Sequence, residues 1–169
     1  FFKNIDKSHP SAKLKYSNAF HLNIHKMTNN AKFKPGDGTQ LWHGTRVGNV
    51  LSIMKNGMKI ISSNTNIVTG RMFGDGLYFS DVSTKALNYS LGTWNNVGKG
   101  NSNKYYALIC EVFMKNTYKI TKKSNVNRFP IDGYDSTFAQ SGINGLKNNE
   151  MIVYSEDQVI PMYLVEFTL

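Results

Sequence analysis

The chain has 169 residues, of which 40% are hydrophobic and 12% aromatic, so it can bury a core and a wholly disordered chain is excluded. Twenty Lys and Arg against 11 Asp and Glu give a net charge of +9, which favours anionic partners such as nucleic acid or phosphorylated cofactors, although a Lys- and Asn-rich drift in composition explains the imbalance equally well. The apolar runs are too short to cross a bilayer, and the single cysteine, Cys110, excludes an internal disulfide framework and a cysteine-rich zinc site.

Residues 1–18 are polar and rich in lysine, and we expect a lead-in or tail, followed by one domain over residues 19–169. Alternating apolar side chains predict a strand over residues 19–27. The stretch 40–57 predicts a short apolar element and then a helix with apolar residues at every third or fourth position, closed by its final glycine. The polar stretch 62–76 is long enough to predict a binding loop.

The middle of the chain predicts a short strand at 77–79 and a helix at about 83–91, with Ser83 as N-cap and Gly92 closing it. Residues 105–114 are apolar on both faces apart from one glutamate, which is typical of a central strand.

The C-terminal third predicts a strand at 117–120 that continues from the central one after a turn, then an irregular segment at 125–149. Two further strands are expected at 150–154 and 158–168. About six strands with two short helices indicate an α+β domain.

Three short segments combine reactive residues with turn residues: LWHGTR at 41–46, FGDGLYFSD at 73–81 and NNEMIVY at 148–154. Taken singly, each has an ordinary explanation. His43 fits a core histidine with a satisfied hydrogen bond, Tyr78 a core tyrosine, and Glu150 a solvated strand end.

Together and in this order, the segments resemble the catalytic domain of the poly(ADP-ribose) polymerases, the diphtheria-toxin-like branch of the ADP-ribosyltransferases. The resemblance rests on HGTR at 43–46, VTGRMFGDGLYFSD at 68–81, KALNY at 85–89 and NEMIVY at 149–154. It extends over roughly residues 20–169. It implies the ADP-ribosyltransferase fold, in which two mostly antiparallel sheets pack together with short flanking helices.

The resemblance implies cleavage of NAD⁺ between nicotinamide and ribose, with His43, Tyr78 and Glu150 as the catalytic residues. Departure of nicotinamide leaves positive charge on the ribose, and one carboxylate, Glu150, would stabilise it. The resemblance gives the cofactor-binding residues as His43, Gly44, Thr45, Gly70, Tyr78, Phe79, Lys85, Ala86 and Tyr89.

Within that set, the backbone of Gly44 is expected to pair with the carboxamide of nicotinamide, and Tyr78 and Tyr89 to sandwich its ring. Ala86 stands where well-known members carry a serine, which removes one polar contact worth about 1 kcal/mol. The pyrophosphate would be held by cations, for which the candidates are Lys59, Arg71 and Lys85.

The acceptor stays open between a protein, including the enzyme itself, and nucleic acid. The resemblance implies that a glutamate at position 150 is compatible with chain elongation, which slightly favours polymer over single-unit transfer. Two alternatives remain: a silent module that binds NAD⁺, ADP-ribose or nucleic acid, and an NAD⁺ glycohydrolase. We expect no metal, no membrane contact, a monomer and an intracellular site. Only about 40 residues precede His43, so we expect no helical regulatory subdomain in this chain.

Overall fold

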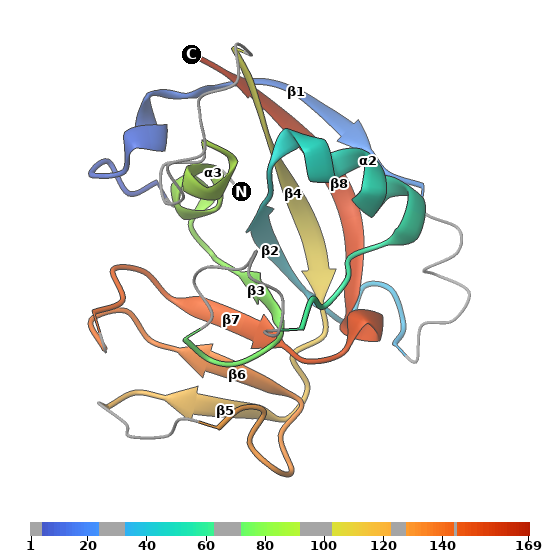
Figure 1. The fold of residues 1–169 in the computed structure, drawn as a ribbon, viewed down its shortest axis with the longest axis vertical. Helices are drawn as coiled ribbons and strands as arrows, with labels where there is room; N and C mark the ends of the chain where they lie inside the picture. Colours follow the sequence, from blue (N-terminus) through green and yellow to red (C-terminus); the bar gives the residue numbers. More distant parts are fainter. Residues whose placement is uncertain (1–4, 24–32, 63–71, 92–102, 123–127, 144) are drawn as a thin grey trace.

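The computed structural model describes residues 5–23, 33–62, 72–91, 103–122, 128–143 and 145–169. Within them the chain forms two four-stranded sheets (Figure 1). The first is antiparallel, in the order β1(Lys15–His21), β8(Val159–Thr168), β4(Lys104–Val112) and β2(Thr39–Gly44). The second has the order β3(Leu77–Phe79), β7(Glu150–Val153), β6(Ser136–Ala139) and β5(Thr117–Ile120), in which only the pair β5 and β6 is parallel. The predicted α+β class with mostly antiparallel sheets is confirmed.

The helices cover opposite faces of the first sheet. Because successive strand residues point to opposite faces, Leu108 of β4 packs in the same cluster as Val50, whereas Ala107 packs with Leu87 on the other face. No helix within the described ranges is long and apolar enough to span a bilayer. The helical elements are α2(Val47–Asn56), α3(Ser83–Ser90) and the 3-10 turns η1(Pro10–Lys13) and η2(Glu156–Gln158).

Helix α2 occupies the stretch predicted from its apolar spacing and ends at Gly57, whose φ of 76° suits glycine. Its packing differs from a simple amphipathic helix. Val50 and Ile53 pack on the core, whereas Leu51 is 77% exposed. The spacing therefore predicts the helix correctly but not the face that it buries.

Two boundaries differ from prediction. Strand β1 begins at Lys15 rather than at residue 19, so the expected limit between a lead-in and the domain falls inside a strand. All seven residues of β1 are exposed, because the strand lies at the sheet edge, and its first half therefore shows no alternation. Helix α3 begins at Ser83, while its N-cap is Val82, whose N–H donates to Ser80 Oγ at 3.1 Å.

Strand β6 was missed, since it lies within the segment predicted to be irregular. It has only four residues, and it is stabilised by pairing with β5 on one side and β7 on the other. Strand β5 follows β4 after a turn at Lys115, which has a φ of 47°, but it belongs to the second sheet.

The two sheets meet where β2 runs beside the end of β3 (Figure 1). The N–H of Trp42 donates to the carbonyl of Ser80 at 2.8 Å, and the N–H of Ser80 donates back to Trp42 at 3.0 Å. This junction places the HGTR segment against the FGDGLYFSD segment.

Candidate active site

His43 is held at the junction of the two sheets. Its Nδ1 lies 2.9 Å from the carbonyl oxygen of Tyr78. Because a carbonyl only accepts, Nδ1 carries the proton, and Nε2 of the neutral ring is free to accept a hydrogen bond. Burial lowers the pKa of His43, and the hydrogen bond to Tyr78 opposes this shift only in part. The imidazole is therefore neutral at pH 7.

Gly44 is required by the close approach of β2 and α3. A Cβ at this position would lie 1.7 Å from the carbonyl oxygen of Ala86, so any side chain would collide with the helix backbone. Trp42, two residues earlier, bonds through its backbone to Ser80 on the outer edge of β2. Alternation along the strand turns the N–H and C=O of Gly44 toward the same edge.

Two tyrosines come from different elements. The hydroxyl of Tyr78 donates to the carbonyl of Gly74 at 2.8 Å and accepts from the N–H of Phe73 at 3.0 Å, which fixes the ring against the turn before β3. Tyr89 lies one helical turn after Lys85 on α3. Burial raises the pKa of Tyr89 to about 12, with a smaller contribution from the negative charge of the nearby glutamate, so its hydroxyl stays neutral.

A buried ion pair joins α3 to β7. Lys85 Nζ lies 2.6 Å from Glu150 Oε1, and the two side chains are only 7% and 8% exposed. The same ammonium donates to the carbonyl of Asn149 at 3.3 Å. Burial lowers the pKa of Lys85, while the charge and hydrogen bond of Glu150 and the charge of Asp81 oppose the shift. Both charged groups have therefore lost most of their contact with water, and each is held in a fixed position by the other.

These residues surround one cavity of about 340 Å³, a size typical of small-ligand sites. All the described residues that the resemblance selected lie on its wall: His43, Gly44, Thr45, Tyr78, Phe79, Lys85, Ala86, Tyr89 and Glu150. Gly70 lies outside the described residues. The structure thus brings together segments separated by more than a hundred positions, although the role of each residue stays a prediction.

The sequence reasoning missed the wall that α2 supplies. Asn49, Ser52 and Ile53 line the cavity, and Asn49 Nδ2 donates to Thr45 Oγ1 at 3.3 Å. The available signal was the predicted helix itself, because its first turn, which contains Asn49, follows directly after the HGTR segment.

The proposed cations for the pyrophosphate have different surroundings. Lys59 lines the cavity, but its Nζ lies 2.6 Å from Glu156 Oε2 at the protein surface. Lys85 is committed to the buried pair described above. Arg71 lies outside the described residues, so Lys59 is the described candidate with an exposed ammonium.

A model of the poly(ADP-ribose) polymerase catalytic domain matches residues 2–145. The chain belongs to this family. Its members are ADP-ribosyltransferases that use NAD⁺ as co-substrate, which confirms the resemblance carried by the short motifs. The match ends before Glu150, so the assignment of that residue depends on its motif and its place in the cavity.

Three relatives show how much of a poly(ADP-ribose) polymerase this chain spans. The protein named "Putative poly(ADP-ribose) polymerase-like 100L" of Invertebrate iridescent virus 6 is 36% identical over 136 residues, covering 76% of this chain and 70% of that protein. Poly(ADP-ribose) polymerase 2 of Caenorhabditis elegans is 42% identical over 72 residues, 43% of this chain and 12% of the relative. Human poly(ADP-ribose) polymerase 2 is 28% identical over 151 residues, 75% of this chain and 26% of the relative. The chain therefore spans a minor part of these two animal relatives.

Proposed function

We propose that this chain cleaves NAD⁺ and transfers its ADP-ribose to a nucleophilic acceptor. The observation that carries the proposal is the buried pair of Lys85 and Glu150 in the wall of a cavity lined by His43 and two tyrosines. A negative charge fixed in a partly dehydrated cavity suits a reaction in which positive charge develops on a sugar.

The nicotinamide end fits the wall formed by β2, β3 and α3. Tyr78 and Tyr89 both line the cavity, and their rings offer apolar faces to a planar aromatic group. The outward backbone of Gly44 supplies a donor and an acceptor, which match the two halves of a carboxamide. Ala86 adds no side-chain hydrogen bond there, because its methyl group has none to give.

Glu150 supplies the electrostatic part of the mechanism. Lys85 engages Oε1 at 2.6 Å, which sets the orientation of the carboxylate and leaves Oε2 for substrate. As the bond between ribose C1 and the nicotinamide nitrogen breaks, its electron pair leaves with neutral nicotinamide, and the sugar becomes cationic. The acceptor then forms the new bond at C1 and loses its proton, for which Glu150 is the nearby base.

His43 and Thr45 fit the other end of NAD⁺. The neutral imidazole offers Nε2 as an acceptor for a ribose hydroxyl, since Nδ1 is used by Tyr78. Thr45 and Asn49 form a polar pair beside it on the cavity wall. These contacts hold the remote half of the substrate in place while the reacting bond lengthens.

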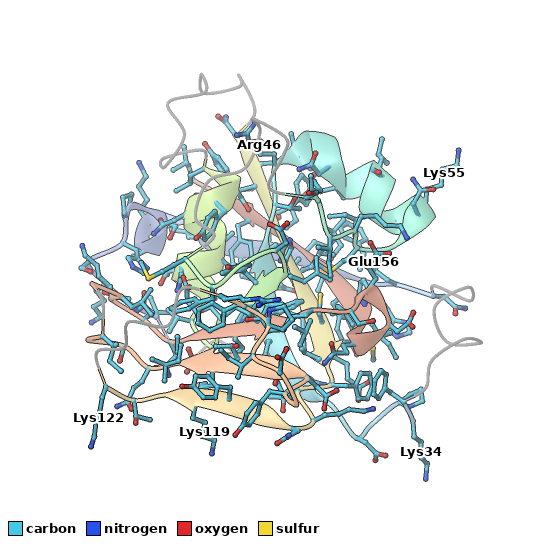
Figure 2. The ribbon with its side chains drawn as sticks, turned by 60° about the horizontal axis from the view of Figure 1, so that its bottom comes forward. Lys34, Arg46, Lys55, Lys119, Lys122 and Glu156 are labelled. Carbon is cyan, nitrogen blue, oxygen red and sulfur yellow. The ribbon has the colours of Figure 1, made fainter. Side chains whose placement is uncertain are left out.

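The acceptor is proposed to be a protein, including a second molecule of the enzyme, or nucleic acid. In Figure 2, Lys34, Lys119 and Lys122 point outward at separate places along the lower edge of the view, and Lys55 points outward at its upper right. Such dispersed charges would steer an anionic acceptor by an attraction that salt screens. Polymer formation, a monomeric state and an intracellular site stay predictions.

The test uses NAD⁺ labelled in its adenine half, with the wild type, Glu150→Gln and the control Glu166→Gln. Glu166 is a matched control because its side chain is 9% exposed and bonds Lys104 at 3.1 Å, away from the cavity. We expect label on protein or nucleic acid with the wild type and the control, and a loss of at least 100-fold with Glu150→Gln.

Chromatography of the products separates the alternatives. Label recovered only as free ADP-ribose would identify a glycohydrolase. Label that stays in NAD⁺ with all three proteins would identify a silent binding module and overturn the proposal.

A further inference from the structure

The segment before the first strand is fastened to helix α3. Thr84, which is 3% exposed, is the centre of this contact. Its Oγ1 accepts from the N–H of Asp6 and lies 3.1 Å from His9 Nδ1, and its carbonyl accepts from Ser11 Oγ at 2.6 Å. The N–H of Ser11 also donates to Asn88 Oδ1 at 3.3 Å. The sequence predicts that this segment is a lead-in. These bonds show instead that residues 6–11 pack against α3.

Asp6 makes a second contact, to the residues that lead into β7. Its Oδ2 accepts from Asn148 Nδ2 at 3.2 Å, while its Oδ1 accepts from the N–H and the hydroxyl of Ser8 at 2.9 and 2.6 Å. The bonds from Ser8 lower the pKa of Asp6 to about 2, with Asn148 adding to the shift, so the carboxylate is charged at neutral pH. Asp6 thus touches α3 through its backbone and the β7 lead through its side chain.

The two residues that Asp6 bonds, Thr84 and Asn148, lie close in the sequence to the two members of the buried pair. Thr84 precedes Lys85 on α3, and Asn148 lies two residues before Glu150. Asp6 does not line the cavity, and its bonds to Thr84 and Asn148 connect it to the two members of the pair. A buried ion pair is sensitive to small changes in separation, because neither charge can recover its lost water.

We propose, resting on the function proposed above, that Asp6 is a positioning residue that holds α3 and the start of β7 at the separation required by Lys85 and Glu150. The link acts on the reacting end of the cavity. It does not touch the wall of α2, where Thr45 and Asn49 lie.

The kinetic test is a double-mutant cycle of Asp6→Ala and Asn148→Ala, with Ser17→Ala as control. Ser17 donates to Glu166 at the edge of the first sheet and contacts neither Thr84 nor Asn148. Each single variant is expected to lower kcat about five- to tenfold, with the KM for NAD⁺ within twofold of the wild type. The double variant is expected to be no slower than the slower single variant, because each single variant already removes the bond between Asp6 and Asn148. Asp6→Ala also removes the bonds from Ser8 and the contact with His9, and is therefore the slower of the two. Effects that multiply, or a kcat within twofold of the wild type, would overturn the proposal.

A second readout is independent of turnover. Amide hydrogen exchange at residues 149–151 should be several-fold faster in both single variants and unchanged in Ser17→Ala, with thermal melting confirming that all three are folded. Exchange at the wild-type rate in both variants would contradict the proposed link. If the wild type transferred no ADP-ribose, the proposed function would fail, while the exchange rates would still decide whether Asp6 holds this region.

Discussion

Two Lys–Glu pairs flank the cavity, and the same distance of 2.6 Å separates Nζ from the carboxylate in each. Lys85 and Glu150 are 7% and 8% exposed, whereas Lys59 and Glu156 are 60% and 36% exposed. Equal geometry therefore does not mean equal importance. The buried pair fixes a charge where we propose that the reaction occurs, and the exposed pair fastens a piece of surface chain.

The two pairs differ in how far water can stabilise a charge that has lost its partner. Removal of one partner from a buried pair leaves an uncompensated charge, which costs about 3–5 kcal/mol. Exposed pairs contribute about 0–1 kcal/mol, because solvent and salt already stabilise the separate charges. Glu156 has a second function, since its Oε1 accepts from the N–H of Ile60 at 2.9 Å and so anchors the chain behind Lys59.

The largest expected difference comes from making the same substitution in both pairs. Lys85→Met should lower the free energy of unfolding by about 3 kcal/mol and the transfer rate by at least 100-fold, because Glu150 loses both its partner and its orientation. Lys59→Met should cost less than about 1 kcal/mol. Urea unfolding and initial rates of nicotinamide release measure the two effects. Similar losses for the two variants would remove the distinction between the pairs.

A second difference is the dependence of the free energy of unfolding on pH. We expect part of it to come from His43, which is buried in the wall of the cavity. The folded pKa of His43 lies below its ordinary value of 6.5, so the unfolded chain binds a proton that the folded one does not. The free energy of unfolding should therefore fall as the pH drops below about 6.5, by up to about 1.4 kcal/mol per pH unit from this group. His9 adds a slope of the same sign, because burial lowers its pKa too.

His43→Gln should make that slope smaller while His9 is intact. Urea unfolding between pH 5 and pH 7 measures the slope for each variant. If the wild-type slope persisted in the doubly substituted His9→Gln, His43→Gln chain, the two buried histidines would not be its source.

A smaller effect is expected at Ala86, which lies beside Gly44 in the buried wall. Ala86→Ser should strengthen the binding of nicotinamide-like inhibitors about fivefold, because one hydrogen bond contributes about 1 kcal/mol. Isothermal calorimetry with benzamide measures the change, and Ala86→Cys serves as a control of similar size. Equal affinity of the wild type and Ala86→Ser would show that the missing hydroxyl has no consequence here.

The smallest effect is expected from the exposed pair. Burial raises the pKa of Glu156, but its hydrogen bonds from Lys59 and Ile60 outweigh this and lower the pKa below 4.5. Glu156→Gln should lower the KM for NAD⁺ about two- to threefold with kcat unchanged, because the Lys59 ammonium loses its counter-charge beside an anionic substrate, and the difference should shrink in 0.5 M salt. A kcat reduced by an order of magnitude would mean that this pair also acts on the chemistry.

Much of the fold follows from local pattern. Strand β4 was predicted from a continuous apolar run, and α2 from its spacing and its final glycine. Strand β6 was not predicted, because its four residues show no pattern of their own and depend on pairing with two neighbouring strands. The first half of β1 escaped because an exposed edge strand needs no apolar alternation.

In the site, too, local sequence predicts the residues but not the contacts between them. Motif resemblance selected Lys85 and Glu150, but nothing local shows that side chains 65 positions apart meet in a buried pair. The partner of Lys59 was equally hidden, since Glu156 lies 97 positions away on η2. Asn49 lines the cavity from the first turn of α2, and Asp6 was assigned to a lead-in because its bonds to Thr84 and Asn148 join residues far apart in the sequence.

The most direct test of the central claim, that the buried carboxylate drives the cleavage of NAD⁺, is single-turnover release of nicotinamide from the wild type and from Glu150→Gln. NAD⁺ affinity is measured by calorimetry on the same two proteins. The account predicts a release rate at least 100-fold lower in Glu150→Gln with an affinity within threefold of the wild type, because the charge is needed in the transition state rather than for binding. Equal release rates, or a loss explained wholly by weaker binding, would contradict it.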